Sequence, residues 1–206
     1  MTSQKSLPIR TLMRRLARNR PAFHSEADFQ LAFGRALEQE FWDDRVRLEY
    51  RIDPSQRRRV DITIFDKKIV FELKYRTRGA QLEHLNERFS LPHQGAYPAT
   101  RFEFLKDIGR IEAWRRDGRI RFGYAIFLTN DLQFWKPKPS GGFVDAQFRL
   151  HDGAVLEGLM GWSDESVRQD REDTVRLDGK YRLKWEDYSE PSTTGFRYLS
   201  VEVDSG

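Results

Sequence analysis

Two short runs of alternating apolar and polar residues, separated by only two residues, constrain the fold of this chain more than any other feature. The runs are Arg59–Phe65 and Lys68–Lys74, with Asp66-Lys67 between them. A loop this short can join antiparallel strands, whereas parallel strands need a crossover of about a dozen residues or more. We therefore predict a β-hairpin centred on the two loop residues.

The two faces of the predicted hairpin differ, because successive side chains of a strand point to opposite faces. One face is entirely apolar and is predicted to belong to the core; it carries Val60, Ile62, Ile64, Ile69, Phe71 and Leu73. On the other face, the same register places Asp61 directly opposite Glu72, and Lys74 follows Glu72 by two positions.

The opposed carboxylates of Asp61 and Glu72 need a compensating partner. Directly opposed side chains have Cβ atoms about 4.5–5.5 Å apart, and like charges at that distance destabilise the pair. A proton, a cationic side chain such as Lys74, or a metal ion can compensate them. Two carboxylates suit a hard, oxygen-seeking divalent cation, most plausibly Mg²⁺. The alternative interpretation is an exposed hairpin face with cross-strand charge pairs.

A helix is predicted ahead of the hairpin, from Ser25 to about Trp42. Ser25 is a suitable N-cap, and Asp28 follows it by three positions. The apolar stripe of this helix consists of Phe29, Phe33, Leu37 and Phe41. At about 100° per residue, Glu26 lies at the centre of that stripe, in the first turn, where an acid is favoured. Glu26 is either a cap-region side chain in water or a third acid directed toward the sheet.

Three further segments complete the predicted centre of the domain. A strand-like alternation covers Arg45–Ile52, and a short helix is predicted around Gln81–Phe89, within a loop at 76–99. Phe122–Leu128 is nearly continuously apolar, as expected of a strand covered on both faces.

A second helix is predicted from the capping-box pattern of Thr100 and Glu103 to about Arg116, where Asp117-Gly118 ends it. One face of this helix carries charges of both signs at a spacing of three or four residues. We expect these side chains to form a salt-bridge lattice: Glu103, Lys106, Asp107 and Arg110.

The length of 206 residues fits one domain. The order helix, three strands, helix, strand predicts an α/β or α+β fold. We expect a basic N-terminal arm at 1–20, then a single domain at 21–206 with its core at about 25–129. Residues 136–179 are interpreted as an elaborated, partly irregular connection, and 180–204 as a C-terminal β-hairpin extension.

The positive charge is concentrated at the N-terminus. The chain has 36 Lys and Arg against 32 Asp and Glu, a formal net charge of +4. Residues 1–20 contain no acid, and their basic residues are Lys5, Arg10, Arg14, Arg15, Arg18 and Arg20. Such an arm suits nucleic acid, with Arg14, Arg15 and Arg18 as candidate contacts; the alternative is a solvated amphipathic helix.

Composition excludes several classes of protein. There is no cysteine, which rules out disulfides, thiol nucleophiles, iron–sulfur clusters and cysteine zinc sites. No run of apolar residues is long enough to span a membrane, and the basic N-terminus lacks the apolar stretch of a secretory signal. We therefore expect a cytoplasmic protein with no membrane partner.

Asp61, followed on the next strand by Glu72-Leu73-Lys74 and preceded by a helix bearing Glu26, resembles the PD-(D/E)XK nuclease superfamily. Its restriction-endonuclease-like core has the order predicted for residues 25–129. Val60 stands where the motif's name has proline. The resemblance implies a mixed central sheet and Mg²⁺-dependent hydrolysis of nucleic acid, DNA rather than RNA, with Mn²⁺ as a substitute. It also allows a homodimer, although no residue pattern indicates an interface.

The resemblance also implies residue roles. Asp61 and Glu72 would bind the metal with the carbonyl of Leu73, and Glu26 would contribute directly or through water. Lys74 would position the attacking water or neutralise transition-state charge; its alternative is a structural ion pair with Glu72. The rival hypothesis is a non-catalytic module on the same fold that binds nucleic acid or protein.

Basic residues surround the predicted site and are candidates for phosphate contacts. They are Arg57, Arg58 and Arg59 before it, Arg76 and Arg78 after it, and Arg101 at the start of the second helix. A solvated loop is the alternative interpretation of the arginine run.

Overall fold

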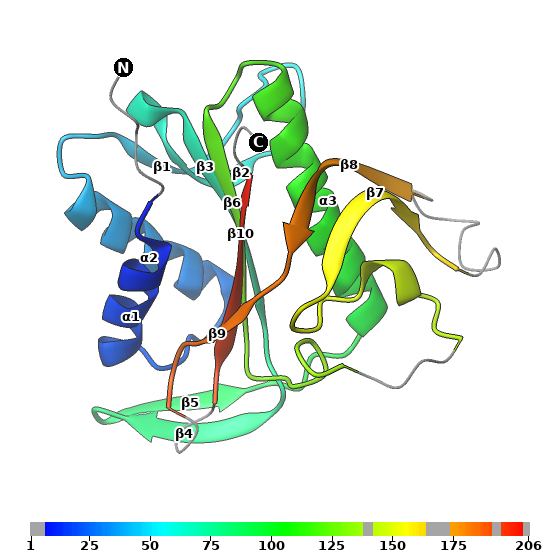
Figure 1. The fold of residues 1–206 in the computed structure, drawn as a ribbon. Helices are drawn as coiled ribbons and strands as arrows, with labels where there is room; N and C mark the ends of the chain where they lie inside the picture. The colour runs from blue at the N-terminus through cyan, green and yellow to red at the C-terminus, as the bar shows by residue number, and fades with distance from the viewer. Residues whose placement is uncertain (1–6, 138–141, 164–173, 191–194, 204–206) are drawn as a thin grey trace.

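A six-stranded mixed sheet forms the centre of the molecule in the computed structural model, which describes residues 7–137, 142–163, 174–190 and 195–203 (Figure 1). Its strand order is β1-β2-β3-β6-β10-β9, and β3 and β6 are its parallel pair. The strands are β1 (Val46–Tyr50), β2 (Val60–Ile64), β3 (Ile69–Arg76), β6 (Phe122–Thr129), β9 (Trp185–Asp187) and β10 (Arg197–Val203). The protein is therefore an α/β protein with a mixed central sheet.

Helices cover both faces of this sheet. Helices α1 (Ile9–Asn19) and α2 (Glu26–Glu40) lie on one face, and α3 (Tyr97–Arg116) lies on the other (Figure 1). A hairpin of β7 (Val155–Gly161) and β8 (Thr174–Arg182) packs over α3. A Cβ at Gly109 of α3 would stand 3.0 Å from Val175 Cγ1, so the absence of a side chain there lets β8 approach closely. None of the described helices is long and apolar enough to cross a membrane.

The predicted hairpin register is confirmed. Strands β2 and β3 pair Ile62 with Phe71 and Ile64 with Ile69, as expected of a loop centred on Asp66-Lys67. The loop is a short 3₁₀ turn at Phe65–Lys67, followed by Lys68 in a left-handed conformation at φ 54°. The apolar face packs beneath α1 and α2, except that Val60 belongs to the core beside α3. Val60 lies beyond the last β2–β3 pair and is paired with Tyr50 of β1.

The start of α2 also agrees with the sequence. The Ser25 hydroxyl accepts the backbone N–H of Asp28 at 3.1 Å, and Phe29, Phe33 and Leu37 are fully buried. The helix ends at Glu40, and Phe41 is its C-cap. Because the N-cap and the apolar stripe depend only on neighbouring residues, both can be predicted from the sequence without the tertiary structure.

Helix α1 belongs to the domain, so the expectation of a separate arm at residues 1–20 is wrong over the described part. Ile9, Leu12 and Met13 of α1 are buried in the same core as α2. Its residues Arg10, Arg14 and Arg18 are exposed, and Arg15 pairs with Glu40 of α2 at 3.4 Å. Residues 1–6, including Lys5, lie outside the described residues.

A second hairpin replaces the short helix predicted around Gln81–Phe89. It consists of β4 (Ala80–His84) and β5 (Glu87–Leu91), and it projects from the end of β3 (Figure 1). Leu85 and Asn86 join the strands with φ of 49° and 65°, the left-handed pair of a two-residue type I′ turn. Leucine is unusual at such a position. An Asn-Gly pair would have indicated the hairpin turn from the sequence, whereas Leu-Asn does not.

Helix α3 begins earlier than the capping-box pattern indicates. It starts at Tyr97, with Pro98 in its first turn, and Thr100 is buried within it. Its end agrees with the sequence: Asp117 is the C-cap, and Gly118 has φ of 70°.

The predicted C-terminal hairpin is present, since β9 and β10 pair antiparallel, but it belongs to the central sheet and is not an extension. Strand β10 pairs with β6 along its whole length, from Arg197↔Thr129 to Val203↔Gly123. The region expected to be an irregular connection contains most of the β7–β8 hairpin, and its 164–173 portion lies outside the described residues. Strand β6 is covered on both faces, as its apolar sequence predicts. It is also paired on both edges, which the sequence does not indicate.

Candidate active site

Strands β2 and β3 separate at Asp61. Their backbone pairing ends at Ile62↔Phe71, and the next contact is made by a side chain. The Oδ2 atom of Asp61 accepts the backbone N–H of Leu73 at 2.6 Å. The carbonyl of Asp61 accepts a hydrogen bond from Gln30 Nε2 of α2 at 2.7 Å. Asp61 is therefore held by side-chain contacts at the point where the backbone ladder has ended.

A second carboxylate continues along the same edge of β3. Glu26 Oε2 accepts the backbone N–H of Tyr75 at 2.8 Å and lies 3.3 Å from Arg76 Nη1. Glu26 thus points to the sheet, as one of its two interpretations predicted. The N–H and carbonyl of a strand residue face the same edge. The carbonyl of Leu73 therefore faces the gap in which Asp61 and Glu26 lie.

Glu72 points toward α3, where it meets an arginine that the sequence did not assign to the site. Its Oε1 atom lies 2.8 Å from Arg110 Nη2 and 3.1 Å from Arg110 Nε. The same Nη2 lies 2.6 Å from Asp107 Oδ1, one helical turn away. Glu72 and Asp107 are 4% and 3% exposed, so this is a buried network. The interpretation of an exposed hairpin face is wrong, because α3 covers it.

Lys74 pairs with Asp107 and not with its strand neighbour Glu72. Its Nζ atom lies 3.4 Å from Asp107 Oδ2. The salt-bridge lattice predicted on α3 exists in part, since Lys106 pairs with Glu103 at 2.7 Å and Arg110 with Asp107. Asp107 and Arg110, however, face the sheet. A parallel β-α-β crossover is nearly always right-handed, and that rule could have placed α3 on the face of Glu72.

Burial and like charge shift the acids of this cluster upward. Burial raises the pKa of Asp61 to about 6, against the opposing effect of the Leu73 N–H. Burial, then repulsion from Asp107, raises the pKa of Glu72 well above its ordinary value despite Arg110. Burial would lower the pKa of Lys74, but the carboxylates of Asp107, Glu26 and Asp61 outweigh it and raise that pKa. The cluster therefore favours positive charge, either as protons on the two acids or as the ammonium group of Lys74.

The donor chemistry of the cluster fits a hard divalent cation. Carboxylates from Asp61 and Glu72 and the carbonyl of Leu73 are the ligand types that Mg²⁺ prefers. Asp107 Oδ2 is buried and makes no hydrogen bond within the described residues. Across that same part of the chain, no three acidic or histidine side chains come close enough together to hold a metal ion. For Glu72, the compensating partner in the structure is a cationic side chain, Arg110.

The predicted phosphate contacts differ in their surroundings. Arg57, Arg58 and Arg59 lie in an exposed segment just before β2, and Arg78 is exposed after β3, whereas Arg76 pairs with Glu26. Arg101 is 3% exposed and bound by Asp145 and by the carbonyl of Gln133. The expectation that Arg101 contacts phosphate is therefore wrong, because its guanidinium is buried inside the fold and is engaged in these contacts.

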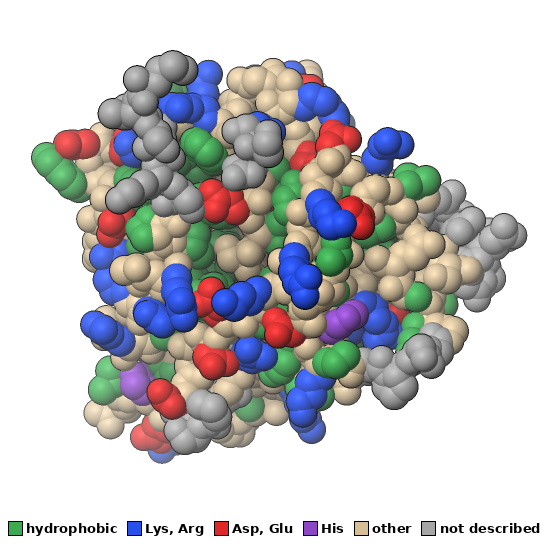
Figure 2. Space-filling model, viewed as in Figure 1, with side chains coloured by type: hydrophobic (Ala, Val, Ile, Leu, Met, Phe, Trp, Pro, Cys, Tyr) green, Lys and Arg blue, Asp and Glu red, His purple; other side chains and the backbone are tan. Residues whose placement is uncertain are grey.

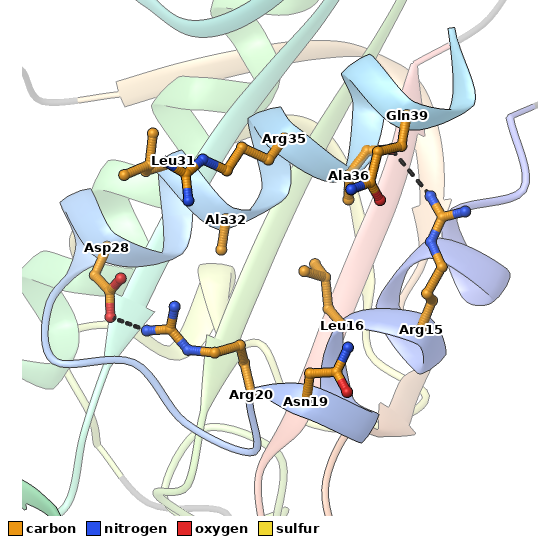
Figure 3. A pocket seen from close by; sticks show the side chains of 10 residues that line it. All are labelled: Arg15, Leu16, Asn19, Arg20, Asp28, Leu31, Ala32, Arg35, Ala36 and Gln39. Atoms are coloured by element: carbon orange, nitrogen blue, oxygen red, sulfur yellow. Dashed lines mark hydrogen bonds and ion pairs between the residues drawn. The ribbon is translucent and has the colours of Figure 1, made fainter. Parts of the chain in front are cut away.

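Arg15 of α1 and its C-cap residue Arg20 line a separate pocket of about 210 Å³ between α1 and α2 (Figure 3). Arg20 pairs there with Asp28 at 2.6 Å, and Arg15 donates to the carbonyl of Ala36 at 3.0 Å. Arg14 and Arg18 are exposed elsewhere on the same helix. On the face seen in Figure 2, basic and acidic side chains are interspersed, so no continuous positive surface appears there.

No family model matches this chain, and searches of curated proteins and of solved structures find no significant match.

Proposed function

We propose that this protein is a metal-dependent nuclease of the PD-(D/E)XK type, which hydrolyses phosphodiester bonds of DNA in preference to RNA. The observation that carries the proposal is the opening between β2 and β3. Two carboxylates, from Asp61 and Glu26, bind backbone N–H groups of β3 in place of a neighbouring strand. A hairpin with a purely structural role would satisfy those groups by continuing its ladder.

The residues beside this opening supply what such a hydrolysis requires. Asp61, Glu72 and the Leu73 carbonyl would hold Mg²⁺, or Mn²⁺ in its place, and Glu26 would contribute directly or through water. When bound, such a cation polarises the phosphate and lowers the pKa of an attacking water. Lys74, held by Asp107 at 3.4 Å, would orient that water or neutralise charge developing on the phosphate.

The exposed arginines support a polyanionic substrate. Arg57, Arg58 and Arg59 directly precede β2, so they enter the sheet at the same end as Asp61. Arg78 follows the end of β3, two residues beyond Arg76. Arginines so placed would neutralise phosphates on either side of the opening, giving affinity that depends on salt and not on sequence.

One observation favours a second candidate, a binding module that does not catalyse. Arg110 pairs with Glu72, and Lys74 pairs with Asp107. These two buried acids therefore have cationic partners without any metal. In that case the arginines would hold nucleic acid or an acidic protein, and the buried acids would be structural.

A cleavage assay separates the two candidates. Supercoiled, linear, single-stranded and branched DNA, and RNA, are incubated with the protein and Mg²⁺ or Mn²⁺, and with chelator as a blank. Asp61→Asn is compared with the control Asp187→Asn, a change at an acid whose side chain is 82% exposed. The nuclease proposal expects cleavage by the wild type and the control and none by Asp61→Asn. Salt-sensitive binding without cleavage by any of the three supports the binding module.

A further inference from the structure

We infer that Arg110 is a built-in counter-cation for Glu72, and that a divalent cation binding at Asp61 and Glu72 transfers the guanidinium from Glu72 to Asp107. The inference rests on the proposed function and concerns a residue outside the Glu72-Leu73-Lys74 motif. It makes Arg110 a positioning residue that competes with the metal and so sets its affinity.

The burial of the two acids is the first argument. Glu72 and Asp107 are 4% and 3% exposed, and an unpaired carboxylate at such depth is strongly unfavourable. Arg110 compensates both at once, since its Nη2 atom lies 2.8 Å from Glu72 Oε1 and 2.6 Å from Asp107 Oδ1. The cation that Glu72 needs is therefore already present in the fold.

The second argument is that Arg110 occupies one of the two carboxylate oxygens of Glu72. The Oε1 atom of Glu72 takes both Nε and Nη2 of the guanidinium. A cation that binds Glu72 through Oε1 must therefore displace Arg110.

The third argument is that Asp107 can bind the guanidinium of Arg110 after its displacement from Glu72. Its Oδ1 atom already binds Arg110, and its Oδ2 atom is buried without a hydrogen bond, with Lys74 Nζ at 3.4 Å. The planar fork of arginine binds both oxygens of one carboxylate in a bidentate pair. Arg110 can thus leave Glu72 without leaving Asp107, so neither acid is left unpaired when the metal arrives.

Mn²⁺ titration calorimetry tests the exchange. Wild type is compared with Arg110→Met, which keeps an unbranched apolar stem without the charge, at about pH 8, where free carboxylates are ionised. The matched control is Arg116→Met, since Arg116 lies on the same helix and forms an exposed pair with Asp178 at 2.7 Å. Because a charged hydrogen-bonding competitor is removed, we expect Arg110→Met to bind Mn²⁺ about 10- to 100-fold more tightly.

Thermal unfolding supplies a readout that does not involve catalysis. Without metal, Arg110→Met should melt well below the wild type, and saturating Mn²⁺ should raise its melting temperature by more than it raises that of the wild type. If Arg110→Met is not folded, Arg110→Lys replaces it, since lysine keeps the charge but lacks the fork; its Mn²⁺ affinity should still exceed that of the wild type.

The outcomes are distinguishable. Equal or weaker Mn²⁺ binding by the variant, beside clear binding by the wild type, overturns the exchange and leaves the nuclease proposal standing. Absence of Mn²⁺ binding by wild type and variant alike overturns both. Tighter binding by Arg110→Met, with Arg116→Met unchanged, supports the exchange.

Discussion

The carboxylate of Asp61 accepts the backbone N–H of Leu73 at 2.6 Å, across the gap where β2 and β3 separate. This contact replaces a backbone hydrogen bond by one from an ionisable side chain. It leaves the other oxygen of Asp61 and the carbonyl of Leu73 at the same opening, and it ties the position of the carboxylate to the edge of β3.

Asp61→Asn should raise the stability of the protein in the absence of metal. An asparagine oxygen can still accept the Leu73 N–H, whereas the cost of a buried negative charge is removed. That cost follows from the pKa of about 6, and the expected gain is about 1–3 kcal/mol at neutral pH. Thermal melts in the presence of chelator measure this gain. An unchanged or lower melting temperature would show that ionised Asp61 does not destabilise the folded protein.

The same carboxyl should make stability fall with rising pH in metal-free buffer. Because the folded-state pKa of Asp61 is raised from 3.8 to about 6, the folded protein binds more protons than the unfolded chain between those values. The contribution of Asp61 is therefore present at lower pH and lost as pH rises through about 6. Denaturant unfolding of wild type and Asp61→Asn across this range should show a difference that grows with pH; parallel curves would contradict it.

Glu72→Gln and Lys74→Ala should affect metal binding differently. Glu72 is a proposed ligand, so its change should weaken Mn²⁺ binding and cleavage together. Lys74 pairs with Asp107 and not with Glu72, so Lys74→Ala should leave Mn²⁺ affinity intact or increased. Its cleavage rate should fall by a factor on the order of 10²–10³. Calorimetry and single-turnover cleavage make the comparison, and equal loss of metal by both variants would reduce Lys74 to a structural role.

Replacing Arg57, Arg58 and Arg59 by glutamine should flatten the salt dependence of DNA binding. For every phosphate that the variant no longer neutralises, the slope of log K against log salt should change by about 0.9 on double-stranded DNA. A control with Arg88, Arg116 and Lys180 changed to glutamine removes the same charge from residues that form exposed ion pairs. Equal slopes for the two triple variants would mean that the arginine run does not bind phosphates of its own.

Leu12→Ala should destabilise the domain by about 2–5 kcal/mol, because Leu12 of α1 is 1% exposed in the core shared with α2. Arg14→Ala, at an exposed position of the same helix, should change stability by less than about 0.5 kcal/mol. Denaturant unfolding measures both. A small effect of Leu12→Ala would restore the view of the N-terminus as a detachable arm, for which truncation at residue 20 would be the right experiment.

Features that depend on neighbours in the chain were predictable from the sequence. The β2–β3 register follows from alternation on both sides of a very short loop, and the start of α2 follows from a serine cap. That register also predicts Asp61 opposite Glu72, but the ladder ends at Ile62↔Phe71, and in the structure Asp61 binds the Leu73 N–H while Glu72 turns to Arg110. Local patterns failed where the turn residues were unusual, as at Leu85 and Asn86 between β4 and β5, and at the start of α3, which begins at Tyr97 and not at the capping-box pattern of Thr100.

Features that depend on distant segments were decided by the tertiary structure. The sequence by itself determined the hairpin, the helix bearing Glu26, and a pair of acids that needed a counter-charge. Only the packing of α3 decided that Arg110 and Asp107 supply that charge, and only the burial of Arg101 against Asp145 removed it from the phosphate contacts. The physical reason is that periodicity and capping report which face of an element is apolar, whereas the partner of a buried charge depends on which elements the whole chain brings together.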